Sequence, residues 1–245
     1  MDYTKIYDES LLEIGGDEQS DGSCIDGYYT HFKQMLPWIG TDYGKGIFNK
    51  IILIGESHYL PKDVNEEMFD PESWYYDVVH SEWYTEGDDE EQMTNTRQFL
   101  SGPLKPHRMY NNTHNVLREV FMEKCPGLIC DNLYRYVTYY NYFLRPARNK
   151  GSIRDIITPD DQKVAFNTLK ELAAILKPDY VFFLSKFAWE SFMNKTSNET
   201  LPFIVGYSDH PSWRWNQVNN YNGTWMTSKE CFKQFLLKNR VFEKL

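Results

Sequence analysis

Residues 50–59 decide the fold, and they read Lys50-Ile51-Ile52-Leu53-Ile54-Gly55-Glu56-Ser57-His58-Tyr59. The β-branched and aliphatic run over residues 48–54 is typical of a parallel strand that is covered on both faces. Titratable residues follow where this run ends. The same transition recurs later in the chain, over Phe203-Ile204-Val205-Gly206-Tyr207-Ser208-Asp209-His210-Pro211-Ser212. Because ligands of open α/β sheets bind beyond the carboxyl ends of strands, these two segments predict one shared site.

Helical and strand patterns alternate along the rest of the chain. We expect strands over residues 48–54, 128–144, 180–184 and 201–207, and helices over residues 26–37, 113–123, 158–176 and 187–193 and from Ser228 onward. The helix at Thr158 has the clearest start, since Pro159 occupies its first turn and Asp161 stands at the third position. The alternation predicts a three-layer α/β/α sandwich with a central, mostly parallel four-stranded sheet.

Composition limits the number of domains and the kind of partner. The chain has 245 residues and no linker-like stretch, which favours a single domain over residues 26–245, preceded by a loose acidic arm over residues 1–25. The net charge of -9 differs from the basic footprint that nucleic-acid-binding proteins usually carry. A local basic cluster, Arg145, Arg148, Lys150 and Arg154, is either a solvated loop or a phosphate-attracting patch.

Cysteine and histidine spacing gives no sign of a metal. The four cysteines match no zinc signature and the histidines form no ligand pattern, so we expect no metal and no cofactor. No apolar run is long enough to cross a membrane, and the N-terminus has no apolar leader. These features predict free thiols, no membrane partner and a cytoplasmic location.

Four motifs occur in a recognisable order. They are Gly55-Glu56-Ser57-His58-Tyr59, Tyr140-Asn141-Tyr142-Phe143-Leu144-Arg145-Pro146, Ile175-Leu176-Lys177-Pro178 before a strand, and His210-Pro211-Ser212. In this order they resemble the motifs of the uracil-DNA glycosylase superfamily, over residues 48–240. The resemblance implies a glycosylase-like fold and hydrolysis of the N-glycosidic bond of a nucleobase, with DNA or another nucleobase-containing ligand as the partner.

The resemblance also implies roles for individual residues. By motif position, the catalytic residues would be Glu56, Ser57, His58 and His210, and the base-binding residues Asn141, Tyr59, Phe99 and Ser212. Asn141 would read the base edge and Phe99 would stack on its face. Nucleic-acid contacts would come from Arg145, Arg148, Trp213 and Arg214, with Trp213 and Trp215 where the family places an apolar wedge. Ser57 stands where several branches of the family have a catalytic Asp.

The chemistry of such a site is defined. Cleavage passes through an oxocarbenium-like state while negative charge builds on the departing base. A carboxylate such as Glu56 would position water and offset the positive charge on the sugar. A donor such as His210 would stabilise the departing base.

Two other interpretations remain open. Gly55-Glu56-Ser57 also resembles the Gly-Asp-Ser block of SGNH-type esterases, with Ser57 as the nucleophile and His210 as its base. That family has an Asp three residues before its His, where this chain has Tyr207. The third interpretation is a non-catalytic, glycosylase-like module that binds a nucleotide or a protein. Asn141 would then only satisfy neighbouring backbone groups.

Overall fold

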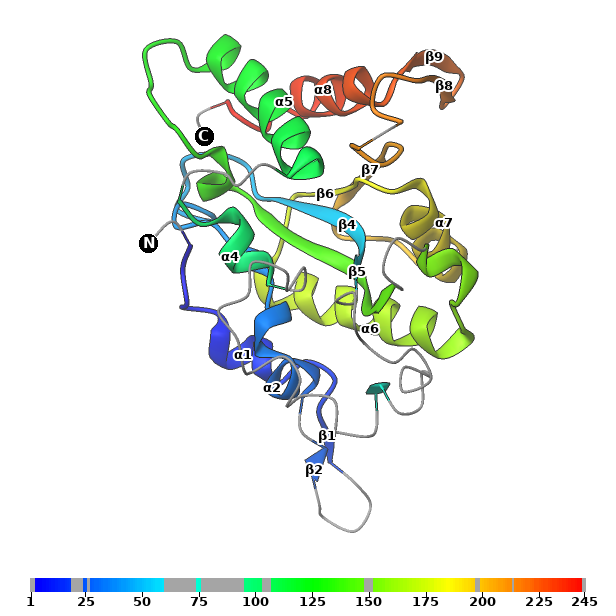
Figure 1. The fold of residues 1–245 in the computed structure, drawn as a ribbon. Helices are drawn as coiled ribbons and strands as arrows, with labels where there is room; N and C mark the ends of the chain where they lie inside the picture. The colour runs from blue at the N-terminus through cyan, green and yellow to red at the C-terminus, as the bar shows by residue number, and fades with distance from the viewer. Residues whose placement is uncertain are drawn as a thin grey trace.

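A five-stranded sheet with helices on both faces forms the body of the molecule (Figure 1). The computed structural model describes residues 3–18, 24–25, 27–59, 74–75, 95–102, 107–147, 152–196, 199–212 and 214–243. The strands of this sheet are β3 (Trp38–Ile39), β4 (Ile51–Tyr59), β5 (Thr138–Ala147), β6 (Tyr180–Phe183) and β7 (Ile204–Tyr207). They lie in the order β3-β5-β4-β6-β7, and all neighbours are parallel except β3 and β5.

The expected mostly parallel α/β architecture is confirmed, but the expected number of four strands is wrong. The additional strand is β3, a two-residue antiparallel edge strand in which Trp38 pairs with Tyr139 and Ile39 with Thr138. So short a segment gives no periodic signal in the sequence. Strand β5 also begins later than expected, since residues 133–136 form the 3-10 helix η4 (Leu133–Tyr136).

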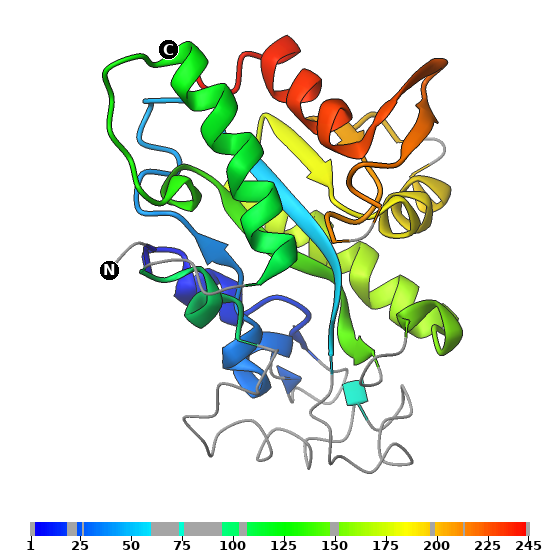
Figure 2. The same cartoon turned by 45° about the horizontal axis from the view of Figure 1, so that its top comes forward.

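Alternating strand residues feed two separate cores. Ile52 and Ile54 of β4 pack with helix α6 (Pro159–Leu176), whereas Ile51 and Leu53 pack on the opposite face with α5 (Arg108–Lys124) and α8 (Ser228–Lys238). Figures 1 and 2 show α6 on one side of the sheet and the pair α5 and α8 on the other. All four aliphatic side chains are fully buried, which explains the continuous apolar run in β4.

Helix α6 begins with the expected cap. Thr158 accepts a hydrogen bond from the backbone N–H of Asp161, and the Asp161 carboxylate accepts one from the backbone N–H of Thr158. Helix α7 (Lys186–Lys195) follows β6 and is capped by Ser185. Helix α8 begins at Ser228 as expected, but its capping residue is Thr227.

The N-terminal segment packs against the domain. Helix α1 (Asp8–Leu12) contributes the buried side chain of Leu11 to the core on the α6 face, together with Ile14 and with helix α2 (Tyr28–His31) and the short helix η1 (Lys33–Met35). Residues 3–16 are therefore not the loose arm that their acidic composition suggested. Strands β1 (Asp17–Glu18) and β2 (Cys24–Ile25) form a separate antiparallel pair.

The remaining elements are short. They are α4 (Thr96–Leu100), the 3-10 helix η5 (Ile153–Asp155) and a hairpin of β8 (Val218–Tyr221) and β9 (Thr224–Thr227) between β7 and α8. The hairpin turns at Asn222 and Gly223, which have φ values of 51° and 88°. Positive φ at both central residues is typical of the type I′ turn, which Asn-Gly favours.

Candidate functional site

The carboxyl end of β4 holds Glu56 in a fixed position. Its Oε2 accepts hydrogen bonds from Ser185 Oγ at 2.5 Å and from Arg154 Nη2 at 2.9 Å. The guanidinium of Arg154 also lies over the ring of Phe187, 4.9 Å from its centroid. No described residue hydrogen-bonds to Oε1. One carboxylate oxygen of Glu56 therefore anchors the side chain, and the other can accept a hydrogen bond from water or a ligand.

Asn141 lies beside Gly55, the residue before Glu56, because β4 and β5 are adjacent. Gly55 and Asn141 are directly paired in the parallel ladder. A Cβ atom on Gly55 would lie well inside 3.0 Å of both Asn141 Oδ1 and the hydroxyl of Tyr139. Gly55 thus allows the buried Asn141 amide to approach the β4 backbone, which a residue with a side chain would prevent.

The orientation of the Asn141 amide is set by Tyr139. The Tyr139 hydroxyl donates a hydrogen bond to Asn141 Oδ1 at 3.1 Å. Burial, with Tyr110 and Tyr134 nearby, raises the pKa of Tyr139 well above its ordinary value, so the hydroxyl stays protonated. No described residue accepts from Asn141 Nδ2, which leaves this amide nitrogen as a donor for a ligand.

Aromatic rings connect this amide to α4 and to the start of α5. Tyr110 packs against Tyr139 with a centroid distance of 5.2 Å, and His107 against Tyr110 at 4.7 Å. Phe99 completes the cluster, 5.8 Å from His107 and 5.9 Å from Tyr110. The ring predicted to stack on a base, Phe99, thus belongs to the aromatic cluster that packs against Tyr139, the residue that bonds to Asn141.

The second motif presents His210 in one defined tautomer. The backbone N–H of Ser212 donates to His210 Nδ1 at 3.3 Å, and Ser212 Oγ lies 2.8 Å from the same nitrogen. Because a backbone N–H can only donate, Nδ1 of this ring is an acceptor, and a neutral His210 carries its proton on Nε2. Ser212, which we predicted to bind the base, orients the His210 ring.

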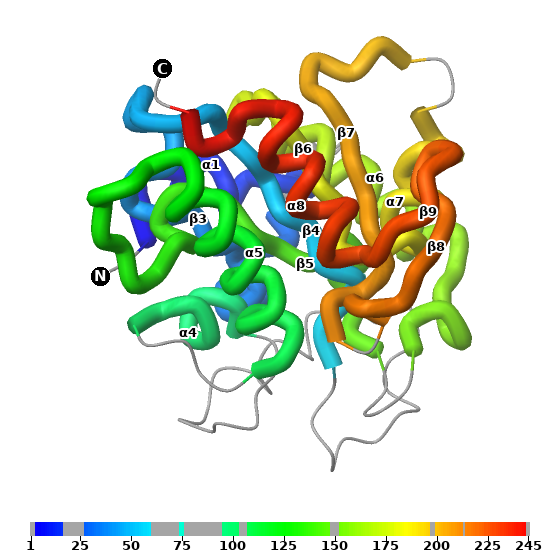
Figure 3. Tube along the Cα trace, turned by 90° about the horizontal axis from the view of Figure 1, so that it is seen from above, coloured from blue at the N-terminus to red at the C-terminus, as the bar shows by residue number. Residues whose placement is uncertain are grey.

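The two motifs approach each other. Figure 3 shows the segment that follows β7 passing beside the end of β4. Burial lowers the pKa of His210, and the neighbouring Glu56 opposes this effect, whereas His107 and Arg154 add to it. Side chains from the end of β4, the start of α5, η5 and the loop after β7 therefore act on one imidazole. The net effect favours its neutral form.

A hydrogen-bond network supports the loop that carries His210. The carboxylate of Asp209 accepts from Tyr221 Oη at 2.9 Å and from Asn219 Nδ2 at 2.8 Å. The backbone N–H of Asp209 in turn donates to Tyr221 Oη at 3.2 Å. On the other side, Asn112 Nδ2 donates to the carbonyl of Pro211 at 2.5 Å. The hairpin and α5 thus hold the loop from two directions.

The other predicted residues of β4 have different surroundings. Ser57 pairs with Phe143 in the β4–β5 ladder and forms no hydrogen bond with His210, both residues being described. His58 is buried, and Tyr59 at the strand end is 37% exposed. Burial, with Glu56 nearby, raises the pKa of Tyr59. Of the four predicted catalytic residues, Glu56 and His210 are near enough for the carboxylate to act on the pKa of the imidazole.

The prediction that Arg145 contacts nucleic acid is wrong. Its guanidinium is buried and forms a two-pronged ion pair with Asp161, with N–O distances of 2.8 and 2.6 Å. It also donates to the carbonyl of Ile156 at 2.6 Å. Arg145 thus locks β5 to the first turn of α6. A basic residue near a strand end gives no sequence signal that distinguishes this role from a surface contact.

The remaining predicted contact residues divide into two groups. Arg214 is exposed and forms no ion pair with a described residue, so it stays available to a partner. Trp215 is buried and packs against Phe232 of α8, so it is not a wedge. Arg148 and Trp213 lie outside the described residues, as does Lys150 of the basic cluster.

Three residues at the site were not assigned to it from the sequence. Ser185 gives only a helix-cap signal, and Arg154 was noted only as part of a basic cluster. His107 matched no metal pattern, yet burial lowers its pKa and it influences His210. Its Nδ1 is buried and has no hydrogen-bond partner among the described residues. Only their position in space connects these side chains with Glu56.

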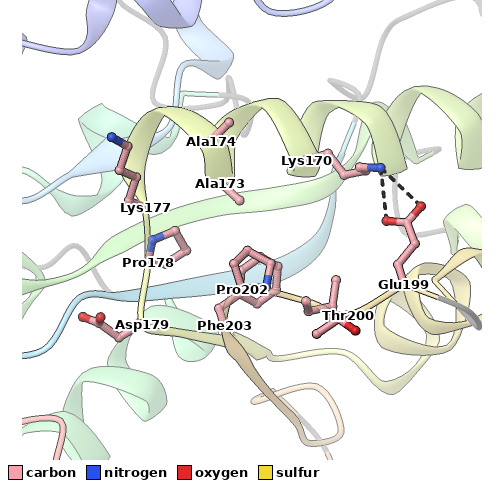
Figure 4. A pocket seen from close by; sticks show the side chains of 11 residues that line it. Lys170, Ala173, Ala174, Lys177, Pro178, Asp179, Glu199, Thr200, Pro202 and Phe203 are labelled. Carbon is pink, nitrogen blue, oxygen red and sulfur yellow. Dashed lines mark hydrogen bonds and ion pairs between the residues drawn. The ribbon is translucent and has the colours of Figure 1, made fainter.

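A cavity of about 470 Å³ lies near the opposite, amino ends of β6 and β7 (Figure 4). It is lined by Ala173, Pro178, Leu201 and Phe203 among others. The ion pair between Lys170 and Glu199, at 3.1 Å, lies at one end of the group drawn in Figure 4. None of its lining residues is a histidine, a serine or an amide. The cavity is therefore separate from the site at the strand carboxyl ends.

Comparison with known proteins gives no relative that could assign the site. No protein-family model matches the chain, and no curated protein matches it. Within the described residues, no group of three or more His, Cys, Asp or Glu side chains is arranged to hold a metal ion. The described helices also include none with the length and apolarity needed to cross a membrane.

Proposed function

We propose that the site at the carboxyl ends of β4 and β5 binds a nucleobase and hydrolyses its N-glycosidic bond, in the manner of uracil-DNA glycosylases. The fold is then the three-layer α/β/α sandwich of that superfamily. The observation that carries the proposal is the pairing of Gly55 with Asn141, one residue before Glu56, with His210 close enough to be influenced by Glu56.

The free donor on Asn141 favours one class of base. Tyr139 occupies Oδ1, so the amide can donate from Nδ2 to a carbonyl oxygen of a ligand. Uracil, thymine, guanine and hypoxanthine carry such a carbonyl, whereas adenine does not. The aromatic cluster of Phe99, His107 and Tyr110 lies nearby to contact the face of the base.

Glu56 and His210 have complementary parts in the reaction. The open Oε1 of Glu56 can orient a water molecule and offset the positive charge that develops on the sugar. The Nε2–H of neutral His210 can donate to the base oxygen as negative charge builds there. Arg154 and Ser185 act as positioning residues, because both bind Glu56 Oε2.

Base release tests the proposal directly. Purified protein is incubated with uracil-containing single- and double-stranded oligonucleotides and with free nucleosides, and released base is measured by chromatography. We expect release that Glu56→Gln and His210→Ala each reduce at least a hundredfold, the scale of general acid–base and leaving-group assistance. Lys45→Ala removes an exposed ion pair with Asp42 and serves as a control that retains activity.

The esterase alternative makes a different prediction. It requires a hydrogen bond between Ser57 and His210 and a carboxylate behind the imidazole. The carboxylate of Asp209 is bound instead by Tyr221 and Asn219. Labelling of Ser57 by a fluorophosphonate probe would support the esterase and contradict our proposal. Nucleobase binding without release would identify a non-catalytic binding module.

A further inference from the structure

The hairpin beside the His210 loop carries an exposed aromatic ring. Trp225 of β9 is 72% exposed, and Val218 of β8 is 58% exposed. Asn220 pairs with Trp225 and Val218 pairs with Thr227, so these four side chains share one face of the hairpin. The opposite face bears Tyr221 and Asn219, which bind Asp209. The outer face is therefore the side of the hairpin that points away from the loop that presents His210.

The hairpin also has an unusual composition for this acidic chain. Residues 215–228 contain no charged side chain, although the whole protein has a net charge of -9. The exposed amides in this stretch are Asn216, Gln217, Asn220 and Asn222. Arg214 precedes the stretch and is exposed, while Lys229 follows it and is paired with Glu119 at 2.6 Å. The hairpin thus lacks the carboxylates that would repel a polyanion.

We propose that the outer face of the β8–β9 hairpin binds single-stranded nucleic acid, with Trp225 stacking on a base outside the candidate site. Stacking on an exposed tryptophan needs no particular sequence, because every base has an aromatic face. The neighbouring amides can bond to base edges or to the sugar–phosphate backbone. This inference rests on the proposed function for the nature of the partner, and it selects a nucleic-acid strand over a free nucleoside as the substrate.

Binding of an oligonucleotide that cannot occupy the base site tests the hairpin alone. We would use a fluorescein-labelled oligodeoxyadenylate of about twelve nucleotides, within the usual range of strand-binding sites. Adenine has no carbonyl for Asn141 Nδ2. Fluorescence anisotropy would compare the wild-type protein with Trp225→Ala, Trp225→Phe and, as a control, Ile129→Ala, which removes another apolar side chain that is 94% exposed.

We expect Trp225→Ala to raise the dissociation constant about tenfold, while Trp225→Phe retains most of the affinity and Ile129→Ala all of it. Unfolding curves for each variant verify that the protein remains folded. Equal affinity of Trp225→Ala and the wild type, or no binding at all, would overturn the inference. A loss of self-association in Trp225→Ala with oligonucleotide binding intact would also overturn it, and would make the hairpin a contact between copies of the chain.

The result of the oligonucleotide-binding experiment does not depend on whether the protein cleaves a glycosidic bond. Oligodeoxyadenylate binding that depends on Trp225 would support the hairpin even if no base is released from any substrate. Base release from nucleosides with no contribution from Trp225 to strand binding would support the proposed function and refute the hairpin.

Discussion

Replacing Gly55 by alanine tests the contact on which the site depends. The new Cβ would overlap with Asn141 Oδ1 and with the Tyr139 hydroxyl, both of which are buried. Overpacking of this kind costs about 1–3 kcal/mol, and loss of the Tyr139–Asn141 hydrogen bond adds about 1 kcal/mol. We therefore expect Gly55→Ala to lower the free energy of unfolding by about 2–4 kcal/mol.

Gly206→Ala is the matched control. Gly206 also lies in a strand of the sheet, and a Cβ there would lie 2.5 Å from the ring of Phe235 and 2.8 Å from that of Phe182. This variant should be destabilised as well, but its overlap is with the core on the α8 face and not with Asn141. Urea unfolding would measure the stability of both variants, and equilibrium dialysis with uracil would measure base binding.

The two variants should differ in base binding. Gly55→Ala displaces the amide that donates to the base, and losing one such hydrogen bond reduces affinity by about tenfold. Gly206→Ala should bind the base as the wild type does. In a protein that already carries Tyr139→Phe and Asn141→Ala, Gly55→Ala should lower the free energy of unfolding much less. The two atoms that its Cβ would overlap, the Tyr139 hydroxyl and Asn141 Oδ1, are then absent. A Gly55→Ala protein with unchanged stability and base affinity would refute this account of Gly55.

Two further predictions concern charged and titrating groups. Arg145→Met leaves Asp161 buried without its ion-pair partner and should lower the free energy of unfolding by about 3–5 kcal/mol. Arg135 also forms an ion pair, with Asp42, but the Arg135 side chain is 45% exposed. Arg135→Met should therefore cost less than about 1 kcal/mol. Chemical denaturation measures both, and a stable Arg145→Met protein with weakened oligonucleotide binding would contradict the structural role. The second prediction concerns pH: burial lowers the pKa of His210, so the folded state favours the neutral ring. Base release should therefore persist somewhat below pH 6.5, the ordinary pKa of histidine. It should decline at more acidic pH, as His210 gains a proton. The contribution of His210 to stability should likewise be present above pH 6.5 and be lost as the pH falls, because the unfolded state then binds more protons. Activity profiles and denaturation at several pH values test this prediction, and His210→Gln should remove the histidine-dependent part of both profiles.

Local sequence was sufficient for much of the fold. Residues that are close together in the chain form both the apolar run of β4 and the cap of Thr158 and Asp161. Periodicity and capping chemistry therefore locate these two features. Asn-Gly between two short strand-forming segments is a strong hairpin signal, and the turn forms at Asn222 and Gly223, but the elements that we expected from the sequence did not include it. The two-residue strand β3 gives no such signal and depends on its partner β5.

The sequence by itself determined that polar residues follow the apolar runs that end near Gly55 and Tyr207, and hence that a site could form toward the carboxyl edge of a parallel sheet. Only the tertiary structure decided which side chains share it. Pairing of β4 with β5 places Asn141 against Gly55, and Ser185 and Arg154 reach Glu56 from segments far away in the chain. The same folding buries Arg145 against Asp161 and removes it from the surface. The reason is physical: residue type and spacing encode local conformation and hydrophobicity, whereas the partner of a charged or amide group is set by which distant segments pack beside it.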